Sequence, residues 1–278
     1  MATVGLIAGS GRFPILVAQE AKRMNVDVVA LGIKGVTDPS LELLVSRLDY
    51  FKLGQLDAPI RAFKAAGVTR AVMAGKVQHA SLFGGVLPDF RAVKVFARLK
   101  DKRTDTILKA VADEFAADGI ELMSSAAYLS HLLAGEGRLS RRGPDVEETA
   151  NMRLGWRAAK AVAGQDIGQT VVVSDNAVVA VEAMEGTDAC ILRAADIAAG
   201  HGKRPRLTVV KVAKPGQDLR FDVPVIGLDS LAVFAKAGVT ALALEAGSTL
   251  LFDKEAFMQH ADAAKLCVMG FSAAGPAS

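Results

Sequence analysis

The sequence predicts an α/β protein of two domains, for three reasons. Short apolar, β-branched segments alternate with segments of helical periodicity along most of the 278 residues. Apolar residues make up 51% of the chain and aromatic residues only 5%, which is typical of helices packed on parallel strands. Residues 135–144 are rich in Gly, Ser, Arg and Pro and have no apolar period, so they form the best linker. We therefore expect an N-terminal Rossmann-like domain (1–134), a linker (135–144) and a C-terminal mixed α/β catalytic domain (145–278).

Composition excludes several classes of protein. No apolar run is long enough to span a bilayer, and the first residues lack a basic segment, so we expect no signal peptide. Two cysteines are too few for a disulfide framework or a zinc site, which favours the reducing cytosol. A net charge of +3 is too small to indicate nucleic-acid binding. The mean hydropathy of +0.30 leaves room for an apolar ligand pocket or a membrane contact, although a deep core is the simpler explanation.

The first domain opens with a buried strand at residues 4–8, a glycine-rich turn and a helix from Pro14 to about residue 24. The turn consists of Gly9, Ser10, Gly11 and Arg12. Glycines at this first strand–helix turn allow a ligand phosphate, or the next stretch of backbone, to come close. Arg12 begins the helix, where it suits an anion better than a dinucleotide.

A dinucleotide fingerprint is incomplete in this region. Its third glycine is replaced by Pro14, and no acidic residue follows the second strand at residues 26–31 to hold a ribose. These departures count against a nucleotide-dependent oxidoreductase, which stays the alternative enzyme.

The rest of the first domain continues the alternation of strands and helices. We expect helices at 39–47, 57–66, 90–100, 104–117 and 126–133, strands at 50–53, 70–74 and 120–123, and a mobile apolar loop at 82–87. The strand at 70–74 ends in Gly75 and Lys76, which places an amine at the edge where open α/β sheets bind ligands. An ordinary exposed lysine is an equally good interpretation of Lys76. Six cations between residues 91 and 103 indicate a solvated helix face or a contact with anionic lipid headgroups.

The second domain begins with a helix at 145–163, whose N-terminal acids suit the helix dipole. A hairpin follows, with strands at 170–173 and 177–183 around Ser174-Asp175-Asn176. Further strands are expected at 207–212, 241–244 and 266–269, with helices at 230–237 and 254–263. Thr187 and Asp188 begin another helix. A helix cap explains both residues, and the alternative is that Asp188 and the first amides of this helix lie beside a diphosphate.

The most informative stretch is residues 207–227, where a buried strand turns abruptly polar. Its polar members within twelve residues are Lys211, Lys214, Gln217, Asp218, Arg220 and Asp222, interrupted by Pro215-Gly216. Carboxylates supply the oxygen ligands that Mg²⁺ prefers, and the cations offset phosphate charge. A solvated loop of alternating charge is an equally good interpretation of the residue types. Pro224 and Gly227 favour the binding site, because they fix the backbone just after Asp222.

Four motifs together resemble one family. They are GLIAGSGRFP at 5–14, AGKV at 74–77, AMEGTD at 183–188 and KPGQDLRFDVP at 214–224. In this order they are similar to the LpxI type of UDP-2,3-diacylglucosamine pyrophosphatase, an enzyme of lipid A biosynthesis. The resemblance extends over nearly the whole chain, and its most specific part is the string that contains Asp222.

The resemblance implies a cytoplasmic, magnesium-dependent hydrolase, peripheral at the inner face of a Gram-negative inner membrane. Such an enzyme cleaves UDP-2,3-diacylglucosamine to UMP and 2,3-diacylglucosamine 1-phosphate (lipid X), with the substrate held between two domains of a probable homodimer. Asp222 matches the key acid of the family.

The residues and the resemblance together predict a site. We expect Asp222, Asp188 and Asp218 to be catalytic, with Asp222 and Asp188 binding Mg²⁺. The predicted substrate contacts are Gly9, Ser10, Gly11, Arg12, Gly75, Lys76, Thr187, Lys211, Lys214, Gln217 and Arg220. A nucleotide-sugar or lipid carrier without turnover is the non-enzymatic alternative, since it would need the phosphate-binding loops but not Asp222.

Overall fold

The computed structural model describes residues 2–77, 88–99, 101, 104–199 and 206–277. The chain forms two compact units: unit 1 consists of Met1–Leu129 with Asp218–Asp222, and unit 2 of Ser130–Gln217 with Val223–Ser278. Both units are α/β, as predicted. A short segment from the second half of the sequence therefore belongs to unit 1.

Unit 1 is built on a parallel sheet whose strand order, β3-β2-β1-β4-β5, is that of a Rossmann-like half. Its strands are β1 (Thr3–Ala8), β2 (Asp27–Ile33), β3 (Arg47–Phe51), β4 (Arg70–Ala74) and β5 (Glu121–Met123). The predicted Rossmann-like parallel sheet is confirmed. Because the strands are parallel, the loops that follow them all leave at one edge, the carboxyl edge.

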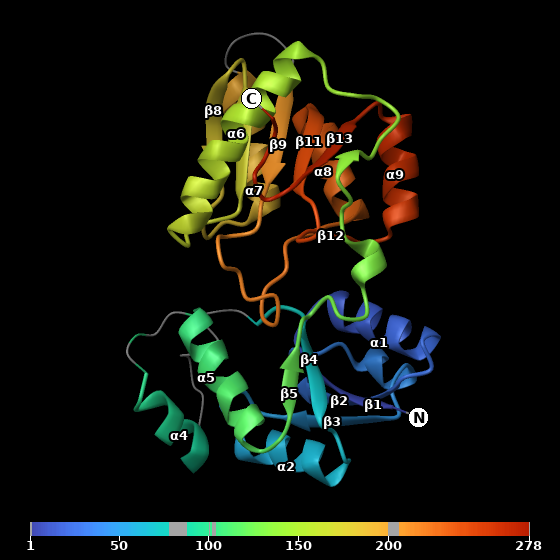
Figure 1. Cartoon of the computed structure of the whole chain (residues 1–278), viewed down its shortest axis with the longest axis vertical. Helices are drawn as coiled ribbons and strands as arrows, with labels where there is room; N and C mark the ends of the chain where they lie inside the picture. The colour runs from blue at the N-terminus through green and yellow to red at the C-terminus, as the bar shows by residue number, and fades with distance from the viewer. Residues whose placement is uncertain (1, 78–87, 100, 102–103, 200–205, 278) are drawn as a thin grey trace. The chain divides into compact units, whose positions relative to one another are not determined.

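Helices pack on both faces of the sheet of unit 1. They are α1 (Phe13–Arg23), α2 (Asp57–Ala65), α4 (Phe90–Phe96) and α5 (Thr104–Ala117). Phe63 of α2 and Phe115 of α5 are fully buried, and they form one cluster with Val29, Leu31 and Leu122 of the strands. Figure 1 shows α1 and α2 on opposite sides of this sheet.

Unit 2 contains a six-stranded mixed sheet in the order β6-β13-β11-β9-β7-β8. Its strands are β6 (Gly137–Arg138), β7 (Thr170–Ser174), β8 (Ala177–Val181), β9 (Leu207–Lys211), β11 (Val239–Glu245) and β13 (Cys267–Phe271). Strands β9, β11 and β13 are parallel, and β6, β7 and β8 pair in the antiparallel sense. A separate parallel pair joins β10 (Val225–Ile226) to β12 (Leu250–Leu251).

Helices cover both faces of the sheet of unit 2 (Figure 1). They are α6 (Val146–Gly164), α7 (Thr187–Ala199), α8 (Leu228–Ala237) and α9 (Lys254–Ala263). Trp156 of α6 packs on the face that carries Val210, whereas Ile191 of α7 packs on the face that carries Val209. Side chains in a strand alternate between the two faces, so Lys211 shares the α7 face with Val209.

The predicted hairpin and the predicted helix after residue 145 are both present in unit 2, and the start of that helix has a capping box that was not predicted. The hairpin β7–β8 turns through Asp175 and Asn176, with φ of 49° and 59°, the left-handed pair that a two-residue type I′ turn requires. Asp145 caps α6 in a capping box: it accepts a hydrogen bond from the Glu148 amide, and Glu148 accepts one from the Asp145 amide.

Other predicted elements are wrong or displaced. Residues 126–133 do not form a helix but a turn followed by the 3₁₀ helix Ser130–Leu132. The backbone there makes only short turn bonds to itself, such as the Leu129 amide to the Ala126 carbonyl, and the Lys254 ammonium donates to the carbonyls of His131 and Leu133. The helix expected at 39–47 is only the 3₁₀ turn Pro39–Leu43, because β3 already begins at Arg47.

The predicted linker, residues 135–144, is part of unit 2. Strand β6 pairs with β13, and the Ser140 hydroxyl accepts from the Val268 amide. The loop expected at 82–87 and the cations Lys100, Lys102 and Arg103 lie outside the described residues. None of the helices within the described ranges combines the length and the hydrophobicity that crossing a bilayer requires.

Candidate functional site

Two strand-end loops meet at the carboxyl edge of unit 1. The Ser10 amide donates to the Lys76 carbonyl (2.9 Å), and the Lys76 amide donates to the Ser10 carbonyl (3.0 Å). The Ser10 hydroxyl donates to the Lys76 carbonyl as well, at 2.9 Å. The turn after β1 and the turn after β4 are therefore tied into one structure, which brings two of the predicted phosphate-binding motifs together.

The glycines of these loops are explained by close backbone contact. A Cβ on Gly9 would lie 2.8 Å from the Lys76 carbonyl oxygen. A Cβ on Gly75 would lie 2.7 Å from the Ser10 carbonyl oxygen, and Gly75 has a φ of 96°. The sequence allows a glycine here to admit either a ligand phosphate or the next stretch of backbone. The structure shows the close approach of the backbone. The Arg12 and Lys76 side chains are exposed at this edge.

Residues Asp218–Asp222 are fixed to the same edge by Ser125, which follows β5. The Ser125 amide donates to the Leu219 carbonyl (2.7 Å). The Ser125 hydroxyl, 1% exposed, lies 2.6 Å from the Met73 carbonyl of β4 and 2.8 Å from the Arg220 carbonyl. Phe221 packs against the apolar cluster of the unit 1 sheet. The segment that carries Asp222 is therefore a built part of unit 1.

Asp218 and Arg220 bind each other. The Arg220 Nη2 donates to Asp218 Oδ2 (2.6 Å), and Nε donates to both carboxylate oxygens. The Arg220 side chain lowers the pKa of Asp218, and the guanidinium also lies 4.9 Å from the centre of the Phe221 ring. Asp222, the other carboxylate of the segment, is exposed.

The backbone is also held directly after Asp222. Val223 and Pro224 are buried, and the Pro224 carbonyl accepts from the Leu250 amide (2.8 Å). Pro224 has a fixed φ, and it restricts Val223 to extended geometry. Asp222 thus lies on a short stretch whose neighbours on either side are fixed.

A buried polar cluster in unit 2 contains two predicted site residues, Thr187 and Lys211. The Thr187 hydroxyl donates to Glu182 Oε1 (2.7 Å) and accepts from Lys211 Nζ (2.8 Å). Lys211 is 6% exposed, also donates to the Thr170 hydroxyl (3.2 Å), and lies 3.9 Å from Glu182 Oε2. The cluster fixes the start of α7, whose first turn carries the exposed Asp188.

Lys214 and Gln217 form a turn. The Gln217 amide donates to the Lys214 carbonyl (3.0 Å), and the Lys214 amide donates to Gln217 Oε1 (2.9 Å). Pro215 and Gly216, the latter with a φ of 69°, occupy the central positions, as in a type II turn. The Lys214 ammonium lies 3.0 Å from the carboxylate of Asp166.

Ser125 and Glu182 were not among the predicted site residues. Ser125 has no local sequence signal, because its partners lie 52 and 95 residues away along the chain. Glu182 directly follows β8, so a search for acids at strand ends would have found it. Glu245, another strand-end acid, is buried and accepts from Lys160 Nζ (2.7 Å) and from the Ala213 amide (2.9 Å), which is a structural role.

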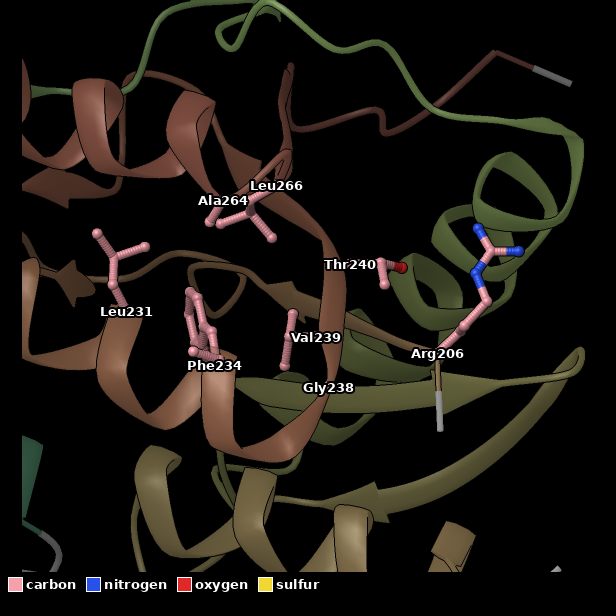
Figure 2. Close-up of a pocket in the computed structure, with 9 residues that line it drawn as sticks. Arg206, Leu231, Phe234, Gly238, Val239, Thr240, Ala264 and Leu266 are labelled. Atoms are coloured by element: carbon pink, nitrogen blue, oxygen red, sulfur yellow. The ribbon is translucent and has the colours of Figure 1, made fainter. Parts of the chain in front are cut away.

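A hollow of about 480 Å³ lies elsewhere in unit 2, at the start of β11. Figure 2 shows Leu231, Phe234 and Leu266 on one side of it and Arg206 on the other. Arg206 is engaged with the carboxylates of α6 and its cap, Asp145 among them. Ligands of α/β sheets bind at the carboxyl ends of the strands, whereas this hollow is at an amino end, and we assign it no role.

No group of three or more His, Cys, Asp or Glu side chains that could hold a metal is present within the ranges that the structure describes. Mg²⁺ commonly takes only one or two carboxylates and completes its shell with substrate phosphates and water. Asp222 of unit 1 and Asp188 of unit 2 are both exposed, and each could supply one carboxylate of this kind.

Solved structures resemble the chain only weakly. A biotin carboxylase domain of a thermophilic 2-oxoglutarate carboxylase is 12% identical with a TM-score of 0.26, covering 63% of this chain and 35% of its own. The corresponding domain from Hydrogenobacter thermophilus is 14% identical with a TM-score of 0.26, covering 74% and 43%. Likeness at this level carries no conclusion.

Sequence comparison is decisive. The model of the LpxI N-terminal domain matches residues 3–132, and the model of the LpxI C-terminal domain matches residues 135–269. A curated protein of Caulobacter vibrioides, named UDP-2,3-diacylglucosamine pyrophosphatase LpxI, is 32% identical over 276 residues, which is 97% of this chain and 98% of the relative. The chain therefore belongs to the LpxI family.

Proposed function

We propose that the chain hydrolyses the diphosphate of UDP-2,3-diacylglucosamine to UMP and 2,3-diacylglucosamine 1-phosphate, a step of lipid A biosynthesis. The name of the Caulobacter relative, which matches this chain from end to end, supports the substrate. The observation that carries the site is the attachment of Asp218–Asp222 to the carboxyl edge of unit 1. There Asp222 belongs to the same edge as the turns that carry Arg12 and Lys76.

The chemistry is an attack of water on phosphorus. The water oxygen forms a bond to one phosphorus, the bridging P–O bond breaks, and the leaving phosphate takes the electron pair. Asp222 is placed in this scheme as the carboxylate that orients the water or takes its proton. Arg12 and Lys76 would offset the negative charge of the diphosphate through charge-assisted hydrogen bonds.

In unit 2 the start of α7 is the proposed phosphate contact. The amides of a first helical turn suit an anion, and Lys211 and Glu182 hold Thr187 in place there. Lys211 thus acts on a ligand through Thr187, because its own ammonium is buried. That one substrate engages groups of both units stays a prediction.

Magnesium is proposed as the cofactor, with Asp222 and Asp188 as its protein ligands. When bound, it would neutralise charge that develops on the diphosphate. The cytoplasmic location at the inner membrane surface and the homodimer stay predictions.

Product analysis tests this function. Purified protein is incubated with UDP-2,3-diacylglucosamine in detergent micelles, with Mg²⁺ or with excess EDTA. We expect UMP and 2,3-diacylglucosamine 1-phosphate in equal amounts, with turnover lost in EDTA and restored by Mg²⁺. Binding without products would support the carrier alternative. Saturable binding of NADH would support the oxidoreductase. Full turnover in EDTA, with no metal retained in the protein, would exclude the magnesium mechanism.

A further inference from the structure

Helix α4 of unit 1 has one face that packs on the protein and one that faces solvent. Ala92 and Val95 are buried in a small cluster with Leu56. At 100° per residue, Phe90, Val93 and Ala97 fall on the opposite side. Phe90 is 75% exposed and Val93 is 48% exposed. A phenyl ring presented to water in this way calls for an apolar partner.

Cations flank this apolar strip. Lys94 is exposed on this side of the helix, and Arg98 is exposed in the turn that follows the helix. The Lys94 ammonium lies 4.5 Å from the centre of the Phe90 ring. The acid that directly precedes Phe90 is engaged in capping. Asp89 caps α4 and accepts from the amides of Leu56, Asp57 and Ala92.

The helix is held rigidly in this orientation. Arg91 binds the carboxylate of Glu114 in α5 (2.7 Å) and that of Asp118, which directly follows α5. These ion pairs and the capping by Asp89 fix the helix to its neighbours, so the outer face is presented without further folding.

Among the described residues, the large apolar side chains that are more exposed than Phe90 all adjoin acids in the sequence. Met184 (98% exposed) precedes Glu185, Val146 (89%) lies between Asp145 and Glu147, and Leu43 (82%) follows Glu42. By contrast, the described charged residues beside Phe90 and Val93 that are exposed include two cations, Lys94 and Arg98. The outer face of α4 is thus distinguished by its charge as well as by its phenyl ring.

We infer that the outer face of α4, defined by Phe90, Val93, Lys94, Ala97 and Arg98, docks on the surface of an anionic phospholipid bilayer. Phe90 and Val93 would enter the boundary between headgroups and acyl chains, while Lys94 and Arg98 bind the lipid phosphates. A second copy of the chain suits this face less well, because a symmetric contact would bring like charges together. The inference rests on the proposed function only in that the substrate is a membrane lipid.

Vesicle sedimentation tests the inference without any substrate. Full-length protein is mixed with vesicles of phosphatidylcholine alone or with 30 mol% phosphatidylglycerol, in low and high salt. We expect binding to the anionic vesicles that weakens in high salt, since exposed charges are screened. The double variant Lys94→Gln/Arg98→Gln should lower the partition coefficient roughly thirty-fold, because each cation near the surface contributes about a factor of five. Phe90→Ser/Val93→Ser should lower it roughly tenfold or more.

Matched controls use exposed residues elsewhere. Leu43→Ser and Lys22→Gln/Lys236→Gln should bind vesicles like the parent, and all variants should hydrolyse micellar substrate at the parental rate. Parental vesicle binding by both α4 variants would overturn the inference and leave membrane association intact. If the parent protein did not bind anionic vesicles, both the inference about α4 and the predicted membrane association would be wrong. Hydrolysis in micelles would still test the proposed reaction. If the α4 variants changed only the mass measured by light scattering, the occupant would be a second copy and the inference would be wrong.

Discussion

At the scale of single residues, Ser125 has the most influence on the candidate site. Its hydroxyl has one proton for two carbonyl acceptors, those of Met73 and Arg220, and its amide binds a third. In all three contacts the partner of Ser125 is a backbone carbonyl. Ser125 therefore positions the segment of Asp222 without depending on the side chains of that segment.

Ser125→Ala should therefore lower kcat as well as stability. The change leaves two buried carbonyls without this donor, which costs about 1–3 kcal/mol of unfolding free energy, and it loosens Asp218–Asp222. Chemical denaturation and steady-state kinetics measure the two effects. Ser140 is a matched control in unit 2, since it is 4% exposed and its hydroxyl also bridges two backbone groups. If Ser125→Ala and Ser140→Ala had the same kcat and the same stability, Ser125 would have no role in positioning.

Arg12→Ala and Lys76→Ala should weaken substrate binding more than they disturb the fold. Both side chains are exposed at the carboxyl edge of unit 1. A hydrogen bond to a charged group contributes about 1.5–3 kcal/mol, so each variant should lose roughly tenfold to a hundredfold in affinity. Arg23→Ala, at the other end of the same helix as Arg12, is the control for titration calorimetry. Parental affinity in both variants would remove this edge from the diphosphate site.

Residue types predicted one feature of this edge, the close backbone contact at the glycine-rich turn after β1. The bonds that tie this turn to the turn after β4 did not follow from residue types, and the family string singled out Asp222, whose role stays a prediction. The pairing of Asp218 with Arg220, and the burial of Lys211 in a cluster with Thr187, did not follow. Both depend on which neighbour a charged side chain finds in the fold, which alternating charges in a loop leave undetermined.

At the scale of elements, helix α6 is held at its start by an ionic network. The Glu148 carboxylate, 2% exposed, accepts two hydrogen bonds from Arg142. Burial alone would raise the pKa of Glu148, but the bonds from Arg142 and from the Asp145 amide outweigh it and leave that pKa lowered. The Glu148 amide and Arg206 likewise lower the pKa of Asp145.

Acid should therefore destabilise unit 2 through this network. A lowered folded pKa means that the stabilisation is complete above the ordinary carboxyl pKa of about 4 and is lost as pH falls through the folded values. Glu148→Gln should lower the free energy of unfolding by roughly 1–3 kcal/mol at neutral pH, because Arg142 loses its buried counter-charge. The variant should also lose less stability than the parent as pH falls from 7 to 3. Thermal unfolding between pH 7 and pH 3 measures this, with Glu255→Gln, an exposed acid of α9, as the control. If Glu148→Gln lost as much stability as the parent between pH 7 and pH 3, other carboxylates would dominate the acid sensitivity of unit 2.

Elements with strong local signals were predicted well. The hairpin β7–β8 and the start of α6 both follow from short-range chemistry: two residues that tolerate positive φ, and an acid three residues from its partner. The expected helix at 126–133 failed, because its backbone bonds to residues more than a hundred positions later, such as Lys254. Local periodicity carries no information about such distant partners.

At the scale of the whole molecule, the chain leaves unit 1 at Leu129, returns to it for Asp218–Asp222 and leaves it again. Composition indicated a division near residues 135–144, but it could not reveal the return. That return depends on the Ser125 contacts and the burial of Phe221, which are properties of the folded unit 1.

Substrates without acyl chains should be poor. The proposed substrate carries two acyl chains, which UDP-N-acetylglucosamine lacks. Burial of acyl chain contributes at most about 0.8 kcal/mol per CH₂, so even a partly sheltered chain would dominate affinity. Competition kinetics in micelles should give a kcat/KM for UDP-N-acetylglucosamine at least a hundredfold below that for the diacyl substrate. Equal values would favour a soluble sugar-nucleotide enzyme.

The most direct test of the account is single-turnover hydrolysis by Asp222→Asn and Asp222→Ala, with a binding titration on the same samples. Asp222 is exposed and its segment is fixed through backbone contacts, so neither change should alter thermal unfolding much. The account predicts a loss of at least about a hundredfold in rate, with substrate binding kept or tightened because a negative charge near the diphosphate is removed. The exposed Asp229→Asn in unit 2 should turn over like the parent. An Asp222 variant that hydrolyses substrate within a few-fold of the parent, or one that unfolds, would contradict the assignment of this carboxylate to the chemistry.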